Sequence, residues 1–457
     1  MGDATKKLAI GMFQTGGVRP TWRMPGREHE RNSTDLGYWI DLARACEDAG
    51  ADFLFLADSY GYPTLHDEVI PTAVERNVQF STVDPQMLVS AIAAATERLG
   101  IVTTVSTQVE PPPVVTRQYR SLDHFTGGRI GWNIVTGSAQ AASALLFGEP
   151  LLAHDERYEK AAEHVDLSLR FWEGCWEDDA LVRDAATGVW ADPARVHEIV
   201  HDGTHFRSRG VLVTPPGPQV TPTLFQAGAS TAGRDLAARY AEAVFLAAEA
   251  PALARQIADI RSRAVGYGRS PDAVKCLVAG TFRVADSRAQ AEDEHAAAIA
   301  RISLAHAATL YAYFTGIDLL SLDLDRPIPA DAAGGDNGRT NIERFLGDDA
   351  PTVREVLEEF RANGVMGRPF LGTPAEVVDQ AEALADETDA DGFLVQPDPD
   401  GGHDRFIRLV MPELRRRGRL KDELPGTTLR EHLFGDGRRR LPDDHPGATH
   451  RRTRATA

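Results

Sequence analysis

Short apolar runs, each followed by small or polar residues, recur along the chain between longer amphipathic stretches. Apolar runs of four to eight residues bounded by such positions are typical of strands buried in a core. The pattern predicts eight of them, at residues 7–13, 51–57, 101–107, 129–135, 221–226, 243–246, 275–284 and 392–396.

The stretches between these runs have the apolar spacing of helices. In the predicted helix at residues 35–50, the apolar face comprises Leu36, Trp39, Ile40, Ala43 and Cys46. Gly50 is expected to end this helix. Repeated strand–helix units of this length favour an α/β fold of the (β/α)8, or TIM barrel, type. No GxGxxG fingerprint follows the first strand, which argues against a Rossmann fold.

The spacing of the strands predicts insertions after strands two, four and seven. The longest, at about residues 286–372, combines Ala-rich helical sequence with a loop. We expect residues 1–435 to form one domain that contains this insertion. Residues 436–457 carry several arginines among Pro, Asp and Thr, a composition that predicts a disordered basic tail.

The composition narrows the class of protein. The net charge of −18 arises from 49 basic and 67 acidic residues, and such a surface repels nucleic acid and anionic membranes. No segment approaches the roughly 18 continuous apolar residues of a membrane span, and the N-terminus does not have the pattern of a signal peptide. We therefore expect a cytoplasmic protein. Its cysteines, Cys46, Cys175 and Cys276, are far apart and are expected to be reduced thiols in or near the core.

Candidate chemistry concentrates at residues 121–158. The strand at residues 129–135 ends in Thr136 and small residues that leave the backbone accessible. His154 and Tyr158 stand four residues apart, so they share one face of a helix. A strand with this ending, followed by a paired His and Tyr, suits an anionic planar ligand at the carboxyl end of the strand.

Active sites of TIM barrels lie at the carboxyl ends of the strands. Candidate site residues are therefore those late in each strand or just beyond it. They comprise Asp58 after strand two, Thr104 to Thr107 late in strand three, Asn133 and Thr136 at the end of strand four, and Ser230 beyond strand five.

Three segments carry a resemblance to a known family: SLDHFTGGRIGWNIVT, HDERY and FQAGAS, in this order. They resemble segments of the luciferase-like flavin-dependent monooxygenases of the nitrilotriacetate monooxygenase type, a group that includes the dibenzothiophene-sulfone and long-chain alkane monooxygenases. The resemblance covers about residues 6–435. It implies contacts with FMN at Asp58, Thr104, His154, Tyr158 and Ser230.

The resemblance also implies an activity. A separate NAD(P)H:flavin reductase would supply FMNH2, which reacts with O2 to give a peroxyflavin that transfers one oxygen atom to a small organic substrate. The protein would position the flavin and exclude water. Relatives associate as homodimers or homotetramers, and the same is expected here.

The segment Gln226–Gly233 is consistent with a binding site for the flavin phosphate. It is a strand-to-helix turn of small residues, and backbone N–H groups at the start of a helix bind anions. The hydroxyl of Ser230 adds a donor, with Thr231 beside it, and Tyr158 and His154 could complete the site. Considered without the resemblance, Ser230 is more simply interpreted as a helix N-cap.

Residues that contact the substrate are harder to assign. Gln14, Gln79, His306 and Tyr311 are candidates, although a surface role fits them equally well, and no catalytic acid or base can be named. The sequence departs from the family pattern at Gly137, where many relatives have Ser, and in the histidine-free loop after strand one. These departures leave the substrate class open.

Two alternatives remain. A deazaflavin-dependent oxidoreductase of the same superfamily would use a similar barrel, although HDERY and SLDHFTGGRIGWN favour the monooxygenases. The HEIVH sequence at residues 197–201 matches the zinc-hydrolase pattern HExxH. Pro193 just before it, and Asp202-Gly203 just after it, argue against the helix that zinc binding would require, so no metal site is predicted.

Overall fold

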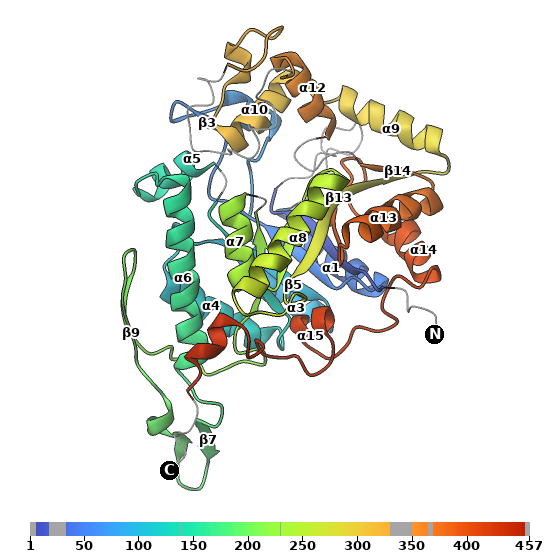
Figure 1. Ribbon diagram of the computed structural model, residues 1–457. Coiled ribbons are helices and arrows are strands. Elements are labelled where there is room, and N and C mark those ends of the chain that lie inside the picture. The colour runs from blue at the N-terminus through green and yellow to red at the C-terminus, as the bar shows by residue number, and fades with distance from the viewer. Residues whose placement is uncertain are drawn as a thin grey trace.

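Eight parallel strands form a closed barrel in the computed structural model (Figure 1). The model describes residues 6–17, 33–137, 139–228, 230–329, 350–363 and 369–452. The barrel strands are β1 (Ala9–Thr15), β2 (Phe53–Ala57), β5 (Gly100–Ser106), β6 (Ile130–Val135), β11 (Thr223–Ala227), β12 (Ala243–Leu246), β13 (Lys275–Val284) and β15 (Gly392–Gln396). Pairing of β12 with β13 and of β15 with β1 closes the sheet, so the predicted TIM barrel is confirmed.

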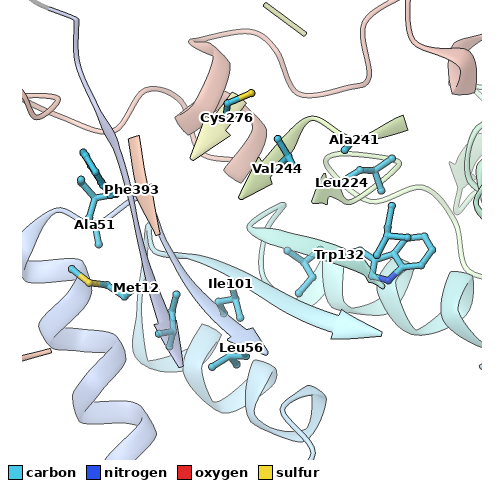
Figure 2. Close-up of a cluster of buried hydrophobic side chains, with 14 of the residues drawn as sticks. Met12, Ala51, Leu56, Ile101, Trp132, Leu224, Ala241, Val244, Cys276 and Phe393 are labelled. Carbon is cyan, nitrogen blue, oxygen red and sulfur yellow. The ribbon is translucent and has the colours of Figure 1, made fainter. Parts of the chain in front are cut away.

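Side chains along each strand alternate between the barrel interior and the surrounding helices. Phe53 and Phe55 of β2 belong to an interior cluster, whereas Leu54 and Leu56 belong to the cluster under the helices. In the interior, the ring of Phe55 lies 5.1 Å from that of Phe245 and 5.6 Å from that of Phe13. Figure 2 shows the other layer, with Met12, Leu56, Ile101, Trp132, Val244 and Phe393 on neighbouring strands.

Helices surround the barrel because each strand leads into an amphipathic segment. They are α1 (Leu36–Ala49), α3 (Gln86–Ala95), α4 (Pro112–Phe125), α6 (His154–Gly174), α7 (Thr231–Tyr240), α8 (Ala250–Gly266), α13 (Pro374–Thr388) and α14 (Met411–Arg416), with the π-helical turn η5 (Phe406–Val410) before α14. In α1 the side chain of Asp35 accepts from the N–H of Gly37. Gly50 ends α1 with φ of +84°, a conformation that favours glycine.

Insertions follow strands two, four and seven of the barrel, as predicted. The first contains β3 (Thr64–Leu65), β4 (Glu68–Val69) and α2 (Pro71–Arg76). The second adds α5 (Gln140–Phe147) before α6, then β7 (Leu181–Asp184), β8 (Val189–Ala191), η2 (Pro193–Arg195), β9 (Ile199–Asp202) and β10 (Arg207–Gly210) after it. The third contains α9 (Arg288–Ala300), α10 (Leu304–Thr315), η3 (Leu319–Ser321), α12 (Val353–Asn363) and β14 (Phe370–Gly372), which pairs with β13.

Helix α15 (Leu429–Phe434) closes the end of the barrel at which the strands begin. Its Leu429 and Leu433 pack with Phe53 and the rest of the interior cluster. Beside them Arg430 forms two hydrogen bonds with the carboxylate of Glu242, at 2.6 and 2.9 Å. Because apolar side chains fill this end, a ligand can approach the interior only from the carboxyl ends of the strands.

Residues 436–452 are ordered, so the prediction of a disordered tail is wrong for them. The tail contains η6 (Pro446–His450), and the side chain of His445 is fully buried with Nε2 2.8 Å from the carbonyl oxygen of Tyr240. Arg451 and Arg440 pair with the buried carboxylate of Glu173, at 2.8 and 3.2 Å. These arginines find a buried acidic partner on α6, which composition alone does not reveal.

Two further sequence-based expectations concern the helices and the thiols. Among the described residues, the helices are all too short or too polar to cross a membrane. Cys46, Cys175 and Cys276 are buried and form no disulfide, as expected.

We predict that truncation after residue 435 destabilises the protein. It would leave Glu173 buried without its arginine partners, and losing one partner of a buried ion pair costs roughly 3–5 kcal/mol. Urea unfolding of the two chains measures this difference. Truncation after residue 452 is the control and should change the free energy of unfolding little, so equal stability of both truncated chains would contradict the assigned role of the tail.

Candidate active site

Polar side chains gather inside the barrel at the carboxyl ends of β5 and β6. Nδ2 of Asn133 donates a hydrogen bond to Oγ1 of Thr104 at 3.0 Å, and Thr104 donates to the carbonyl oxygen of Leu56 at 3.1 Å. These bonds fix the amide of Asn133 with its oxygen turned away from Thr104. The side chain is 2% exposed, and Oδ1 has no hydrogen-bond partner among the residues that the structure describes.

An unsatisfied buried acceptor costs roughly 1–3 kcal/mol, so Asn133 suggests a ligand that supplies a donor. Asp58, Thr104, Ser106, Gly137 and Ser143 line a small cavity between the ends of β2, β5 and β6 and helix α5. Gly137 has φ of +92°, and an added Cβ would meet no atom closer than 3.7 Å. The backbone beside the cavity is therefore open to a ligand.

A second cavity lies next to the first and shares Gly137 and Ser143 with it. It is lined by Thr136 and, from the α6 side, by Arg157 and Lys160. Nζ of Lys160 donates to the carbonyl oxygen of Gln108 at 2.8 Å. These two cationic side chains thus come from α6, the helix that also carries His154 and Tyr158.

Carboxyl groups dominate the side of the rim formed after β2. Burial, together with the charges of Asp84 and Glu110, raises the pKa of Asp58 to about 6. Oη of Tyr60 donates to Oε1 of Glu110 at 3.0 Å. Burial also raises the pKa of Glu110, although the bond from Tyr60 lowers it. This side of the rim is acidic and can retain a proton near pH 6.

The predicted anion site brings together α6 and α7. Oγ of Ser230 lies 3.5 Å from Oη of Tyr158, and the rings of Tyr158 and His154 are 5.1 Å apart. Ser230 also accepts from the N–H of Gly233 at 3.1 Å, so it is the N-cap of α7 as well. Thr231 is the first residue of α7, and the positive end of the helix faces this group of hydroxyls.

The four substrate candidates do not line either cavity. Gln14 points out of the barrel toward α1, and its Nε2 donates to Oη of Tyr38 at 2.9 Å. Tyr311 is buried in a separate small core of α10 and α12, with its ring 5.2 Å from that of Phe360. Gln79 is exposed after α2, and His306 lies in the first turn of α10.

The HEIVH segment lies in a hairpin rather than on a helix. Ile199–Asp202 is strand β9, which pairs with the antiparallel strand β10. His201 contacts Glu163 at 2.9 Å, and His197 contacts Glu177 at 2.8 Å. The described residues include no group of three or more His, Cys, Asp or Glu side chains that could hold a metal ion.

The sequence did not single out Tyr60, Glu110 and Ser143 for the site. Ser106 belongs to the candidate segment Thr104 to Thr107, and it shares the strand face of Thr104 because it stands two residues later. Glu110 gave no such signal, since it meets Tyr60 only through the packing of two loops 50 residues apart.

Comparisons with known proteins place these features in context. The family model described as Luciferase-like monooxygenase matches residues 17–422. A long-chain alkane monooxygenase from Geobacillus thermodenitrificans (strain NG80-2) is 36% identical over 454 residues, with 98% of each chain covered. A dimethyl-sulfide monooxygenase from Hyphomicrobium sulfonivorans is 37% identical over 436 residues, covering 94% of this chain and 90% of that protein.

Among solved structures, a riboflavin lyase with modified FMN and its substrate riboflavin has a TM-score of 0.91 and 39% identity, covering 98% of this chain and 100% of that one. The predicted resemblance to luciferase-like monooxygenases is confirmed by the family match and these relatives.

We predict that Glu110→Gln lowers the pKa of Asp58, because it removes a like charge. The shift should be roughly 0.5 unit, the size expected for a charge partly screened by water. Burial still acts, so the pKa should stay above 3.8. Carboxyl-carbon NMR across pH 4–8 measures it. Glu423→Gln, which removes an exposed charge after α14, is the matched control, and an unchanged Asp58 in Glu110→Gln would refute the coupling.

Proposed function

Because the chain belongs to the luciferase-like monooxygenase family, we propose that it is a flavin-dependent monooxygenase that inserts one oxygen atom from O2 into a small organic substrate. The observation that carries this proposal is the pairing of Ser230 with Tyr158 at the start of α7. It is supported by the buried Oδ1 of Asn133 on β6, which has no hydrogen-bond partner among the described residues. The Ser230–Tyr158 pair offers a site for the phosphate of a flavin. Oδ1 of Asn133 offers an acceptor for a hydrogen-bond donor of the flavin ring system.

The residues of the rim fit FMN. Ser230, Thr231, Tyr158 and His154 would hold its phosphate, with the backbone N–H groups at the start of α7. Asp58, Thr104, Asn133 and Thr136 would border its ring system. Asn133 contributes a fixed acceptor, because its amide nitrogen is already bonded to Thr104. Gly137 leaves the backbone open where a planar ring can approach closely.

Bound FMN in its reduced form supplies the electrons that reduce O2, with one oxygen atom passing to the substrate and the other to water. The chain contributes binding, orientation and exclusion of water. Beneath the rim, the aromatic layer of Phe13, Phe55 and Phe245 seals the barrel interior. Asp58, whose pKa is about 6, can hold or release a proton at its carboxyl group near neutral pH.

We further propose that FMNH2 comes from a separate NAD(P)H:flavin reductase, because the sequence has no GxGxxG fingerprint after its first strand. The assembly is proposed to be a homodimer or homotetramer, and its place of action the cytoplasm. The deazaflavin alternative is disfavoured by the family match and by relatives named as monooxygenases. The zinc-hydrolase alternative is disfavoured by the hairpin that contains HEIVH.

A second candidate function is cleavage of riboflavin or a similar flavin. Its support is the 39% identity and TM-score of 0.91 to the riboflavin lyase. Incubating the FMN-loaded protein with riboflavin, O2 and a flavin reductase, followed by mass spectrometry of the products, separates the two candidates. Loss of the ribityl chain would favour this activity, whereas intact riboflavin would favour the first.

Ser230→Ala and Tyr158→Phe are each expected to weaken FMN binding roughly tenfold, because each removes a hydroxyl bond to a charged phosphate. Quenching of FMN fluorescence measures the dissociation constant. Ser90→Ala, on the exposed side of α3, is the matched control. Loss of the N-cap also lowers the stability of the Ser230→Ala variant. The FMN affinity of Tyr158→Phe, which keeps the N-cap, is therefore the stronger test of the phosphate site. Normal FMN binding by both variants would exclude the proposed phosphate site.

Rapid mixing tests the whole proposal. Anaerobic protein loaded with reduced FMN is mixed with oxygenated buffer, and the return of oxidised-flavin absorbance is followed. We expect the return to be slower than for free reduced FMN, because the site excludes water. Reoxidation at the rate of free FMN would mean that the flavin is not held productively.

A further inference from the structure

Helix α5 presents an unusual apolar surface beside the rim. It buries Ala142 and Ser143 but leaves Leu145, Leu146 and Phe147 55%, 57% and 42% exposed. The ring of Phe147 packs edge-on against that of Tyr60 at 4.9 Å. Figure 1 shows α5 at the end of α6 where that helix begins. We call the side chains Tyr60, Leu145, Leu146, Phe147 and Leu151 the rim patch; Leu151 is 51% exposed.

The rim patch is continuous with the candidate active site. Tyr60 lines the first cavity together with Asp58 and Thr104, and Leu151 lines the second together with Thr136. Ser143 of α5 lines both. Contiguous exposed apolar side chains mark binding surfaces. An apolar molecule that lies on the patch would therefore reach the same cavities that we assign to the flavin.

The acidic side chains around Tyr60 limit which molecules can bind on the rim patch. Glu110 accepts the hydrogen bond of Tyr60, and Asp58 and Asp84 lie close enough to act on both. At the opposite side of the rim, beyond β13 and β15, the buried cation Arg283 is compensated by Asp398 at 3.6 Å and Asp400 at 3.1 Å. Arg157 and Lys160, both on α6, line the second cavity but not the first, which Tyr60 and Asp58 line.

We propose, resting on the proposed monooxygenase function, that the substrate is a neutral, apolar molecule that binds on the rim patch, and that Asp58, Asp84 and Glu110 exclude carboxylated substrates. The apolar side chains supply the binding free energy, since each buried methylene contributes roughly 0.8 kcal/mol. The acidic groups supply the selectivity, since a ligand carboxylate would be repelled by each of them.

A pair of thioethers of equal length tests the inference. Dibutyl sulfide is neutral, and thiodipropionate replaces each terminal ethyl group by a carboxylate. Isothermal titration of the FMN-loaded protein at pH 8 is expected to show at least roughly tenfold tighter binding of dibutyl sulfide. Equal binding, or preference for the dicarboxylate, would overturn the proposal.

Variants test separately whether the acidic side chains cause the selectivity and whether the apolar side chains of the rim patch cause the binding. Glu110→Gln should narrow the difference between the two ligands, and Leu146→Ser should weaken dibutyl sulfide several-fold. Glu423→Gln and Val265→Ser, which change an exposed charge and an exposed apolar side chain elsewhere, should alter neither. If Leu146→Ser leaves dibutyl sulfide binding unchanged but shifts the sedimentation of the protein toward a smaller species, the patch covers a second copy and the proposal is wrong.

FMN fluorescence in the same samples separates this inference from the proposed function. Protein that does not quench FMN refutes the proposed function. Protein that binds FMN but shows no preference for dibutyl sulfide refutes the substrate class alone.

Discussion

The closure of a parallel sheet on itself is the constraint on which the rest of the molecule depends. Once β12 pairs with β13 and β15 with β1, alternate side chains of each strand must point into one shared interior. That interior is filled by phenylalanine, leucine, valine and alanine side chains, so the layer around Phe55 is apolar. All strands run in one direction, and their carboxyl ends therefore meet at one rim. With α15 closing the opposite end, this rim is where chemistry can occur.

The rim is divided electrostatically. On one side, the positive end of α7, the hydroxyls of Ser230 and Tyr158, and the cations of α6 favour an anion. On the other, Asp58, Asp84 and Glu110 repel one. A phosphorylated flavin placed with its phosphate on the first side leaves the acidic and apolar side to the substrate. Under the proposed function, the same charges would orient the flavin and select a neutral substrate.

Buried ion pairs connect distant parts of the chain to the barrel and its surrounding helices. Arg430 joins α15 to Glu242 at the start of β12, and Arg440 and Arg451 join the tail to Glu173 on α6. Arg283 of β13 joins the loop after β15 through Asp398 and Asp400. Removing one partner of such a pair leaves an uncompensated buried charge. These pairs consequently favour one arrangement of segments that are far apart in the sequence.

Much of the architecture was predictable because it depends on local patterns. A strand or an amphipathic helix is encoded by neighbouring residues, so all eight barrel strands and the positions of the insertions could be read from apolar runs and their spacing. The residues of the proposed anion site could also be named from local patterns, since Ser230 stands at a strand-to-helix turn and His154 and Tyr158 share one helical face; the structure brings Ser230 close to Tyr158. Each of these predictions rests on residues within a few positions of one another.

Only the tertiary structure decided the features that depend on contacts between segments far apart in the sequence. Gln14 faces α1 because the alternation of β1 places it outside the barrel, and Tyr311 packs with Phe360 because the third insertion forms its own small core. The pairing of Tyr60 with Glu110 and the order of the tail around Glu173 require partners brought together by folding. The sequence by itself determined the barrel and its family. Only the tertiary structure decided the acidic rim, the apolar patch and the ordered tail, because burial and charge pairing are properties of contacts between segments that local sequence does not specify.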